Sequence, residues 1–110
     1  MDQTLAAQRL SELGHDTRLS IFRLAVRAGD QGLPVGQIQT ELGVTASTLT
    51  HHLHRLVAAG LIAQQRDGRT LNCVAKLGAL REVMDFLNSE CCANLPYQQS
   101  QSPNTIPKTA

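Results

Sequence analysis

The sequence predicts a mainly α fold with a small β-hairpin, a winged helix-turn-helix, within a single domain. Three consecutive features predict it. A short helical stretch at 35–42 is followed by a turn at Gly43 and by a longer amphipathic helical stretch from about Ala46 to Ala59. Two short strands, 61–65 and 70–74, then flank an Arg-Asp-Gly-Arg turn, and Asp-Gly is a strong hairpin signal. This order is typical of a fold in which one helix reads double-stranded DNA and the hairpin holds the phosphate backbone.

Helical spacing of apolar residues predicts further helices around this unit. The first helix, of about three turns, ends at Gly14. The second starts near Asp16, a good N-cap residue, and runs to Gly29 with apolar residues around most of its circumference. We therefore expect it in the middle of the core. Pro34 fits the first turn of the helix that Gly43 stops.

The last predicted helix spans about residues 77–92, and its apolar stripe continues to an adjacent pair, Cys91 and Cys92. The first and last helices carry more apolar surface than a three-helix core can cover. Two-fold pairing through both helices would bury these stripes and would set two recognition helices about one DNA turn apart, so we expect a homodimer. The stripe of the last helix consists of Leu80, Val83, Met84 and Leu87.

We expect residues 1–93 to form the DNA-binding and dimerisation domain, and the Gln/Ser/Pro/Thr-rich residues 94–110 to be a disordered tail. No apolar run approaches the roughly 20 residues that cross a bilayer, and the N-terminal residues lack a signal-peptide pattern. A cytoplasmic protein without a membrane partner is therefore expected. No Gly-rich phosphate loop accompanies the cysteines and histidines, and no third group is placed to orient a base, which argues against an enzyme.

The charge distribution favours duplex DNA as the partner. The formal net charge is only +1, yet no acidic residue lies between Val44 and Arg66. Aromatic residues make up 3% of the chain, which disfavours a base-stacking platform for single strands.

The predicted recognition helix buries Leu49, Leu53, Leu56 and Val57 and turns its polar face outward. His52 lies at the edge of the buried stripe, where a structural hydrogen bond to a neighbouring helix competes with base contact. Arg66 and Arg69, at the hairpin tip, are predicted phosphate-backbone or minor-groove contacts, although they could be solvated turn charges. The predicted major-groove residues are Ser47, Thr48, Thr50, His51, His54 and Arg55.

Four stretches, LGHDTRLSIF (13–22), LGVTASTLTHHL (42–53), LVAAGLI (56–62) and RDGR (66–69), resemble the ArsR/SmtB family of bacterial metalloregulatory repressors. The resemblance covers about residues 5–92, and its phrase S-T-L-x-x-H-L is fairly specific. It implies a dimeric repressor that occupies an operator and releases it when an inducer binds.

Departures from the family pattern narrow the class of inducer that the resemblance implies. One subgroup has a Cys-x-Cys pair at the start of the recognition unit, and residues 41–47 contain no sulfur. Another binds zinc, cobalt or nickel through Asp and His ligands of the last helix, and this last helix contains no His. What remains resembles the subgroup whose last helix ends in Cys-Cys and senses trivalent arsenic or antimony. Members often add a third cysteine just downstream, which residues 93–110 do not supply.

The cysteines therefore predict an As(III) or Sb(III) inducer, because three thiolates form a natural cap around such soft ions. Cys91 and Cys92 supply two sulfurs, and the third comes from Cys73 of the same or the other subunit or from an external thiol such as glutathione. No cofactor is expected for folding. Cys91 could instead be an interface residue, Cys92 an incidental surface residue, and Cys73 a packed strand residue. The functional alternative is a redox or reactive-sulfur sensor of the same fold, in which Cys73 pairs with Cys91 or Cys92.

Overall fold

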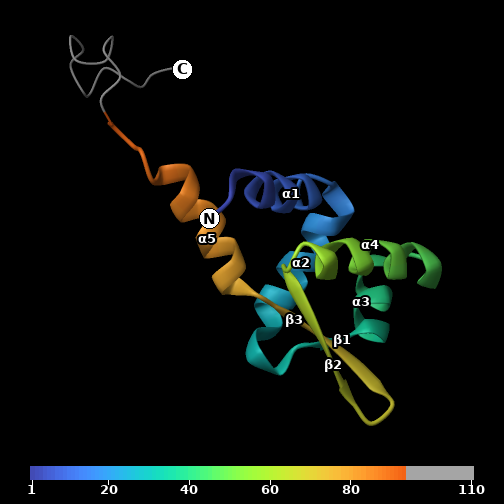
Figure 1. Ribbon diagram of the computed structural model, residues 1–110. Helices are drawn as coiled ribbons and strands as arrows, with labels where there is room; N and C mark the ends of the chain where they lie inside the picture. The colour runs from blue at the N-terminus through green and yellow to red at the C-terminus, as the bar shows by residue number, and fades with distance from the viewer. Residues whose placement is uncertain (94–110) are drawn as a thin grey trace.

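The computed structural model describes residues 1–93 as a winged helix-turn-helix with five α-helices and a three-stranded sheet (Figure 1). The predicted fold class is confirmed, and the tail at 94–110 lies outside the described residues. The elements are α1 (Gln3–Leu13), α2 (Asp16–Ala28), the 3₁₀ turn η1 (Gly29–Gln31), β1 (Leu33–Pro34), α3 (Val35–Leu42), α4 (Ala46–Ala58), β2 (Ile62–Asp67), β3 (Thr70–Ala75) and α5 (Leu77–Asn88).

Helix α2 lies in the middle of the core, as its apolar circumference predicts. Ile21 and Ala25 are fully buried, and Phe22 is almost so. Around them pack residues of α3, α4 and the sheet, namely Ile38, Leu49, Leu53, Leu56, Ala59, Leu61, Ile62 and Cys73. One face of α4 packs against this cluster, and the opposite face of α4 is exposed.

The sheet contains a third strand that the sequence did not indicate. β1 pairs antiparallel with β3, with Leu33 opposite Cys73, and the strand order is β1-β3-β2. A two-residue strand is too short to show alternation. Gly32 permits it: its φ is 77°, and a Cβ there would lie 2.9 Å from Val74 Cγ2. Pro34 consequently lies in extended conformation as the N-cap of α3 rather than in its first turn.

Two predicted helix ends also differ. His15, not Asp16, caps α2, because its Nδ1 accepts a hydrogen bond from the Thr17 amide. Helix α5 ends at Asn88 instead of near Cys92. Side chains compete for its last carbonyls: Asn88 Nδ2 donates to Met84 O at 3.1 Å and Ser89 Oγ donates to Phe86 O at 2.8 Å.

Helix α5 runs outward beside α1, away from the β2–β3 hairpin, which extends at the opposite end of the molecule (Figure 1). Val83 is the buried residue of α5, whereas Met84 and Leu87 are 54% and 61% exposed in the protomer. On α4, Val57 is exposed rather than part of the buried stripe, and His52 is buried in its place. No helix among the described residues is long and apolar enough to cross a membrane.

Candidate nucleic-acid interface and thiol site

The polar face of α4 is built from its N-terminus. Thr45 is the N-cap, and its hydroxyl accepts a hydrogen bond from the Thr48 amide at 3.3 Å. The Thr45 hydroxyl also donates to Thr48 Oγ1 at 2.9 Å, so one predicted groove residue belongs to the cap. The predicted residues of α4 are all exposed and lie on the side away from the core: Ser47, Thr48, Thr50, His51, His54 and Arg55.

Arg55 differs from the other residues of this face because it is already paired. Its Nε donates to Glu12 Oε1 at 2.8 Å and its Nη2 donates to Glu12 Oε2 at 3.3 Å. This two-pronged bond joins α4 to α1, and it lowers the pKa of the Glu12 carboxyl. In this state Arg55 links two helices rather than projecting freely toward DNA.

The sequence suggested two roles for His52, a structural hydrogen bond or a contact with a base. The structure shows the hydrogen bond. His52 Nδ1 lies 3.3 Å from Arg18 Nη1, and both side chains are buried. A guanidinium can only donate, so Nδ1 accepts and the ring is neutral with its proton on Nε2. Burial lowers the pKa of His52, and the nearby His15, with its ring centroid 4.8 Å away, acts in the same direction.

The hairpin presents two arginines at its tip, on the side where α3 and α4 lie (Figure 1). Asp67 pairs with Thr70, so the connecting turn consists of Gly68 and Arg69. Gly68 has a φ of 64°, the left-handed conformation that tight hairpin turns require. Arg66 and Arg69 are both exposed.

Cys91 and Cys92 lie on an exposed turn just after α5, and their sulfurs are 3.4 Å apart. The Cys91 amide donates to Asn88 O at 2.9 Å, and Cys92 has a φ of 64°, which is uncommon for a residue other than glycine. Both thiols therefore point to the same side. The hydrogen bond with Cys92 raises the pKa of Cys91.

Cys73 lies in a different environment. It is fully buried in β3 opposite Gln64, whose Nε2 approaches its sulfur to 3.9 Å, and burial raises the pKa of its thiol. Helix α5, of 12 residues and about 18 Å in length, separates β3 from the vicinal pair. One chain therefore does not bring the three sulfurs together, and residues 1–93 contain no group of three metal-binding side chains.

Three buried charged residues were not predicted from the sequence, namely Arg9, Glu12 and Arg18. Arg18 Nε donates to the Glu12 carbonyl at 2.8 Å and lies 3.1 Å from Glu12 Oε1. A signal was available, because Arg9 follows Ala6 at helical spacing on the side that α1 turns toward the core. A charged residue on a buried helical stripe indicates a specific partner.

Comparisons with known proteins agree with this geometry. A family model described as a helix-turn-helix domain matches residues 13–65. The HTH-type transcriptional regulator YgaV of Escherichia coli K12 is 31% identical over 87 residues, which cover 79% of this chain and 86% of that protein. A Halobacterium salinarum protein assigned as an arsenical resistance operon repressor is 36% identical over 61 residues, 56% of this chain but only half of its own length.

Solved structures show the same fold. An ArsR-like transcriptional regulator from Rhodococcus sp. RHA1 superposes with a TM-score of 0.70 at 23% identity, covering 79% of each chain. Another ArsR family regulator gives a TM-score of 0.73 at 16% identity and covers 93% of this chain and 98% of its own.

The fold and these relatives define a DNA-binding transcriptional regulator and not an enzyme. The recognition helix, the hairpin and the matched sequence together identify the type. The chain belongs to the ArsR/SmtB family of helix-turn-helix regulators.

Proposed function

We propose that the protein is a repressor that occupies a duplex operator and releases it when Cys91 and Cys92 bind As(III) or Sb(III). The observation that carries this proposal is the pair of exposed free thiols whose sulfurs lie 3.4 Å apart. Soft ions prefer thiolates, and no carboxylate or imidazole cluster in residues 1–93 offers a site for harder cations. A relative assigned as an arsenical resistance operon repressor supports the same class of inducer.

The position of the two sulfurs also bears on the third ligand. They lie in contact on the exposed turn after α5, so a single ion can reach both. An external thiol is the third ligand that best suits an exposed pair, because Cys73 would have to leave its buried position to take part.

On the DNA, α4 enters the major groove. Ser47, Thr50, His51 and His54 face the bases, whereas Thr48 supports the helix cap and Arg55 is held by Glu12. Arg66 and Arg69 hold the phosphate backbone.

The outward-facing apolar stripe of α5, exposed except at the partly buried Leu80, pairs two chains. Its members alternate at three- and four-residue spacing, as in the seam of a coiled coil, and continue into the turn at Cys91. We define this stripe as the α5 seam; it consists of Leu77, Leu80, Met84, Leu87 and Cys91.

Charges beside the α5 seam favour antiparallel pairing. Lys76 is the N-cap of α5 and Glu90 lies in the turn just after the helix, so opposite charges stand at the two ends of the seam. Antiparallel helices centred near Met84 bring Lys76 of one chain to Glu90 of the other, an opposite-charge pair that occurs twice. Parallel helices would instead oppose Lys76 and Arg81, which repel each other.

Fluorescence anisotropy of labelled operator DNA tests the inducer. Wild-type protein should release DNA on addition of arsenite or antimonite, whereas Cys91→Ser and Cys92→Ser should bind DNA normally and require at least about tenfold more arsenite, because a hydroxyl cannot replace a soft thiolate. Cys73→Ser is the matched control and should respond like wild type. Release from both vicinal variants at the wild-type arsenite concentration would contradict the proposal.

The same titration distinguishes the second candidate, a redox sensor, which the exposure of the free Cys91 and Cys92 thiols also favours. Release by peroxide, with a disulfide found by mass spectrometry and no response to arsenite, would support that candidate. Zinc and cadmium serve as controls for general thiol binding.

The DNA face has its own test. Arg69→Ala should weaken all duplexes about equally and reduce the salt dependence of binding by about one unit of slope, since one phosphate contact is lost. His51→Ala should change the preferred bases instead. Equal loss on every duplex sequence for both variants would contradict the assignment of the recognition face.

A further inference from the structure

We infer that Arg9 is a positioning residue that carries a movement of α5 to the recognition helix α4, with Glu82 as its side-chain contact on α5. The inference rests on the proposed function, because α5 leads into the thiol pair that would bind the inducer. Its basis is a junction at which α1, α4 and α5 meet around one guanidinium group.

The Arg9 side chain is 11% exposed and bonds two other helices at once. Its Nε donates to the Ala59 carbonyl at 2.9 Å, while its Nη1 donates to the Ala79 carbonyl at 3.1 Å and to Glu82 Oε1 at 2.9 Å. Ala59 is the C-cap of α4, where carbonyls lack partners within the helix and a cation is favourable. Arg9 therefore ties the end of the recognition helix to the beginning of α5.

Glu12, one turn further along α1, holds α4 at a second point. Its carboxylate binds Arg55, which lies one turn before Ala59. Two contacts one turn apart fix both the rotation and the position of α4 against α1, whereas one contact would leave a pivot. α1 and α4 thus form one unit, and α5 packs against α1 and is bonded to this unit through Arg9.

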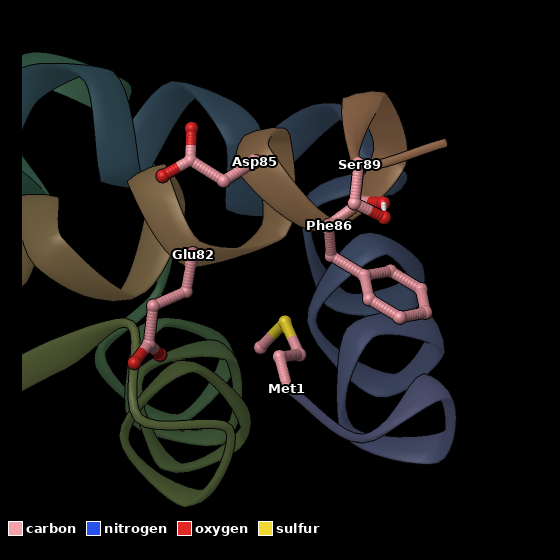
Figure 2. Close-up of a pocket in the computed structure, with 5 residues that line it drawn as sticks. All are labelled: Met1, Glu82, Asp85, Phe86 and Ser89. Carbon is pink, nitrogen blue, oxygen red and sulfur yellow. Dashed lines mark hydrogen bonds between the residues drawn. The ribbon is translucent and has the colours of Figure 1, made fainter. Parts of the chain in front are cut away.

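The arms of the Arg9 junction differ in strength. The bond to Ala59 is buried, but the Glu82 side chain is 62% exposed, and water screens exposed ion pairs. Glu82 also lines an open hollow of about 360 Å³ between α5 and the N-terminal residue, together with Met1, Asp85, Phe86 and Ser89 (Figure 2). The hollow leaves α5 room to shift, and the Glu82 carboxylate would move with it and displace Arg9 through their bond.

The other side of the guanidinium lies against the α4–β2 connection, since a Cβ at Gly60 would lie 3.2 Å from Arg9 Nη2. Arg9 Nε also donates to the Ala59 carbonyl there, so a displacement of Arg9 would act on the last turn of α4. Movement of α5 would thus displace the C-terminal end of the recognition helix first, rather than the face proposed to contact DNA.

The test measures coupling between inducer and DNA, defined as the ratio of operator affinities without and with saturating arsenite. Glu82→Gln removes the charge of the α5 arm, and Arg9→Lys keeps a cation that lacks the planar fork needed for all three acceptors. Asp85→Asn is the matched control, because this carboxylate lines the same hollow and makes none of the ion pairs of residues 1–93. We expect coupling to fall at least about tenfold in Glu82→Gln and Arg9→Lys, with arsenite affinity and inducer-free DNA affinity within about twofold of wild type.

A residue with only a structural role would lower stability and inducer-free DNA affinity and leave the coupling ratio intact. Wild-type coupling in Glu82→Gln or in Arg9→Lys, or an equal loss in Asp85→Asn, would overturn the inference.

Hydrogen exchange makes the test independent of arsenite. The Gly60 and Leu61 amides donate to Val57 O and Leu56 O in the last turn of α4, and we expect both to exchange faster in Glu82→Gln than in Asp85→Asn. If wild-type protein ignores arsenite, the proposed function fails, and this measurement alone decides the Arg9 junction. Unchanged exchange in Glu82→Gln would then overturn it.

Discussion

The recognition end and the thiol end of the protomer are supported in different ways. Helix α4 has a side-chain cap at Thr45 and packs into the core through its own fully buried residues, such as Leu49 and Leu56. The thiols follow a helix whose buried residue is Val83 and whose long apolar stripe faces outward. In the proposed function, one chain presents the whole recognition face. Within residues 1–93, by contrast, no third metal-binding side chain lies beside the thiol pair and most of the α5 seam is exposed, so the thiol end is the part that a second chain or an external thiol would complete.

The largest expected effect would come from disrupting the assembly. Leu87→Glu places a charge in the α5 seam and should convert the dimer to monomers, with a loss of at least about 100-fold in operator affinity because the second half-site no longer adds to binding. Sedimentation and anisotropy measure the two quantities. Leu19→Glu is the control, since Leu19 is an exposed leucine of α2 outside the seam. A Leu87→Glu variant that remains dimeric would show that the seam does not pair the chains.

The packing of α4 against the core predicts the next effect. Leu56 is fully buried on the core-facing side of α4, so Leu56→Ala should lower the free energy of unfolding by about 2–5 kcal/mol. Val57, its neighbour, is 37% exposed, so Val57→Ala should cost clearly less. Urea unfolding provides both values. Equal costs at the two positions would mean that α4 is rotated relative to the described core.

A smaller effect concerns pH. Burial keeps the pKa of His52 below its usual value, so the unfolded chain takes up a proton before the folded protein does. Stability should be unaffected well above pH 6.5 and should fall as the pH decreases through and below about 6.5. His52→Gln, which can still accept a hydrogen bond from Arg18, should flatten this decline. Urea unfolding between pH 5 and 8 measures it, and an equal flattening in the exposed control His54→Gln would rule out His52 as its cause.

The elements predicted well from sequence are those determined by local pattern. The apolar circumference of α2, the stripe of α4 apart from Val57 and the hairpin around Asp67-Gly68 each depend on residues a few positions apart, and these match the structure. The exposed polar residues of α4 and the two hairpin arginines also lie where the pattern puts them.

The features that were missed depend on partners distant in sequence. β1 forms because Gly32 allows the chain to approach β3 closely. His52, which is hydrogen-bonded to Arg18, is buried where the pattern placed Val57. The pairing of Arg55 with Glu12 joins the recognition helix to α1, 43 positions earlier in the chain. No helical or strand periodicity contains such information, because the acceptor is a neighbour only after folding.

The Arg9 junction also has a consequence for the order of folding. Its bonds to Ala79 and Glu82 span 70 and 73 positions of the chain, so the whole helix-turn-helix and hairpin must be closed as a loop before they can form. Contacts this distant are expected after the folding transition state. Arg9→Lys should then accelerate unfolding and leave the folding rate nearly unchanged, which stopped-flow measurements can separate. A nascent chain would thus form its helix-turn-helix and hairpin before α5 is docked against Arg9.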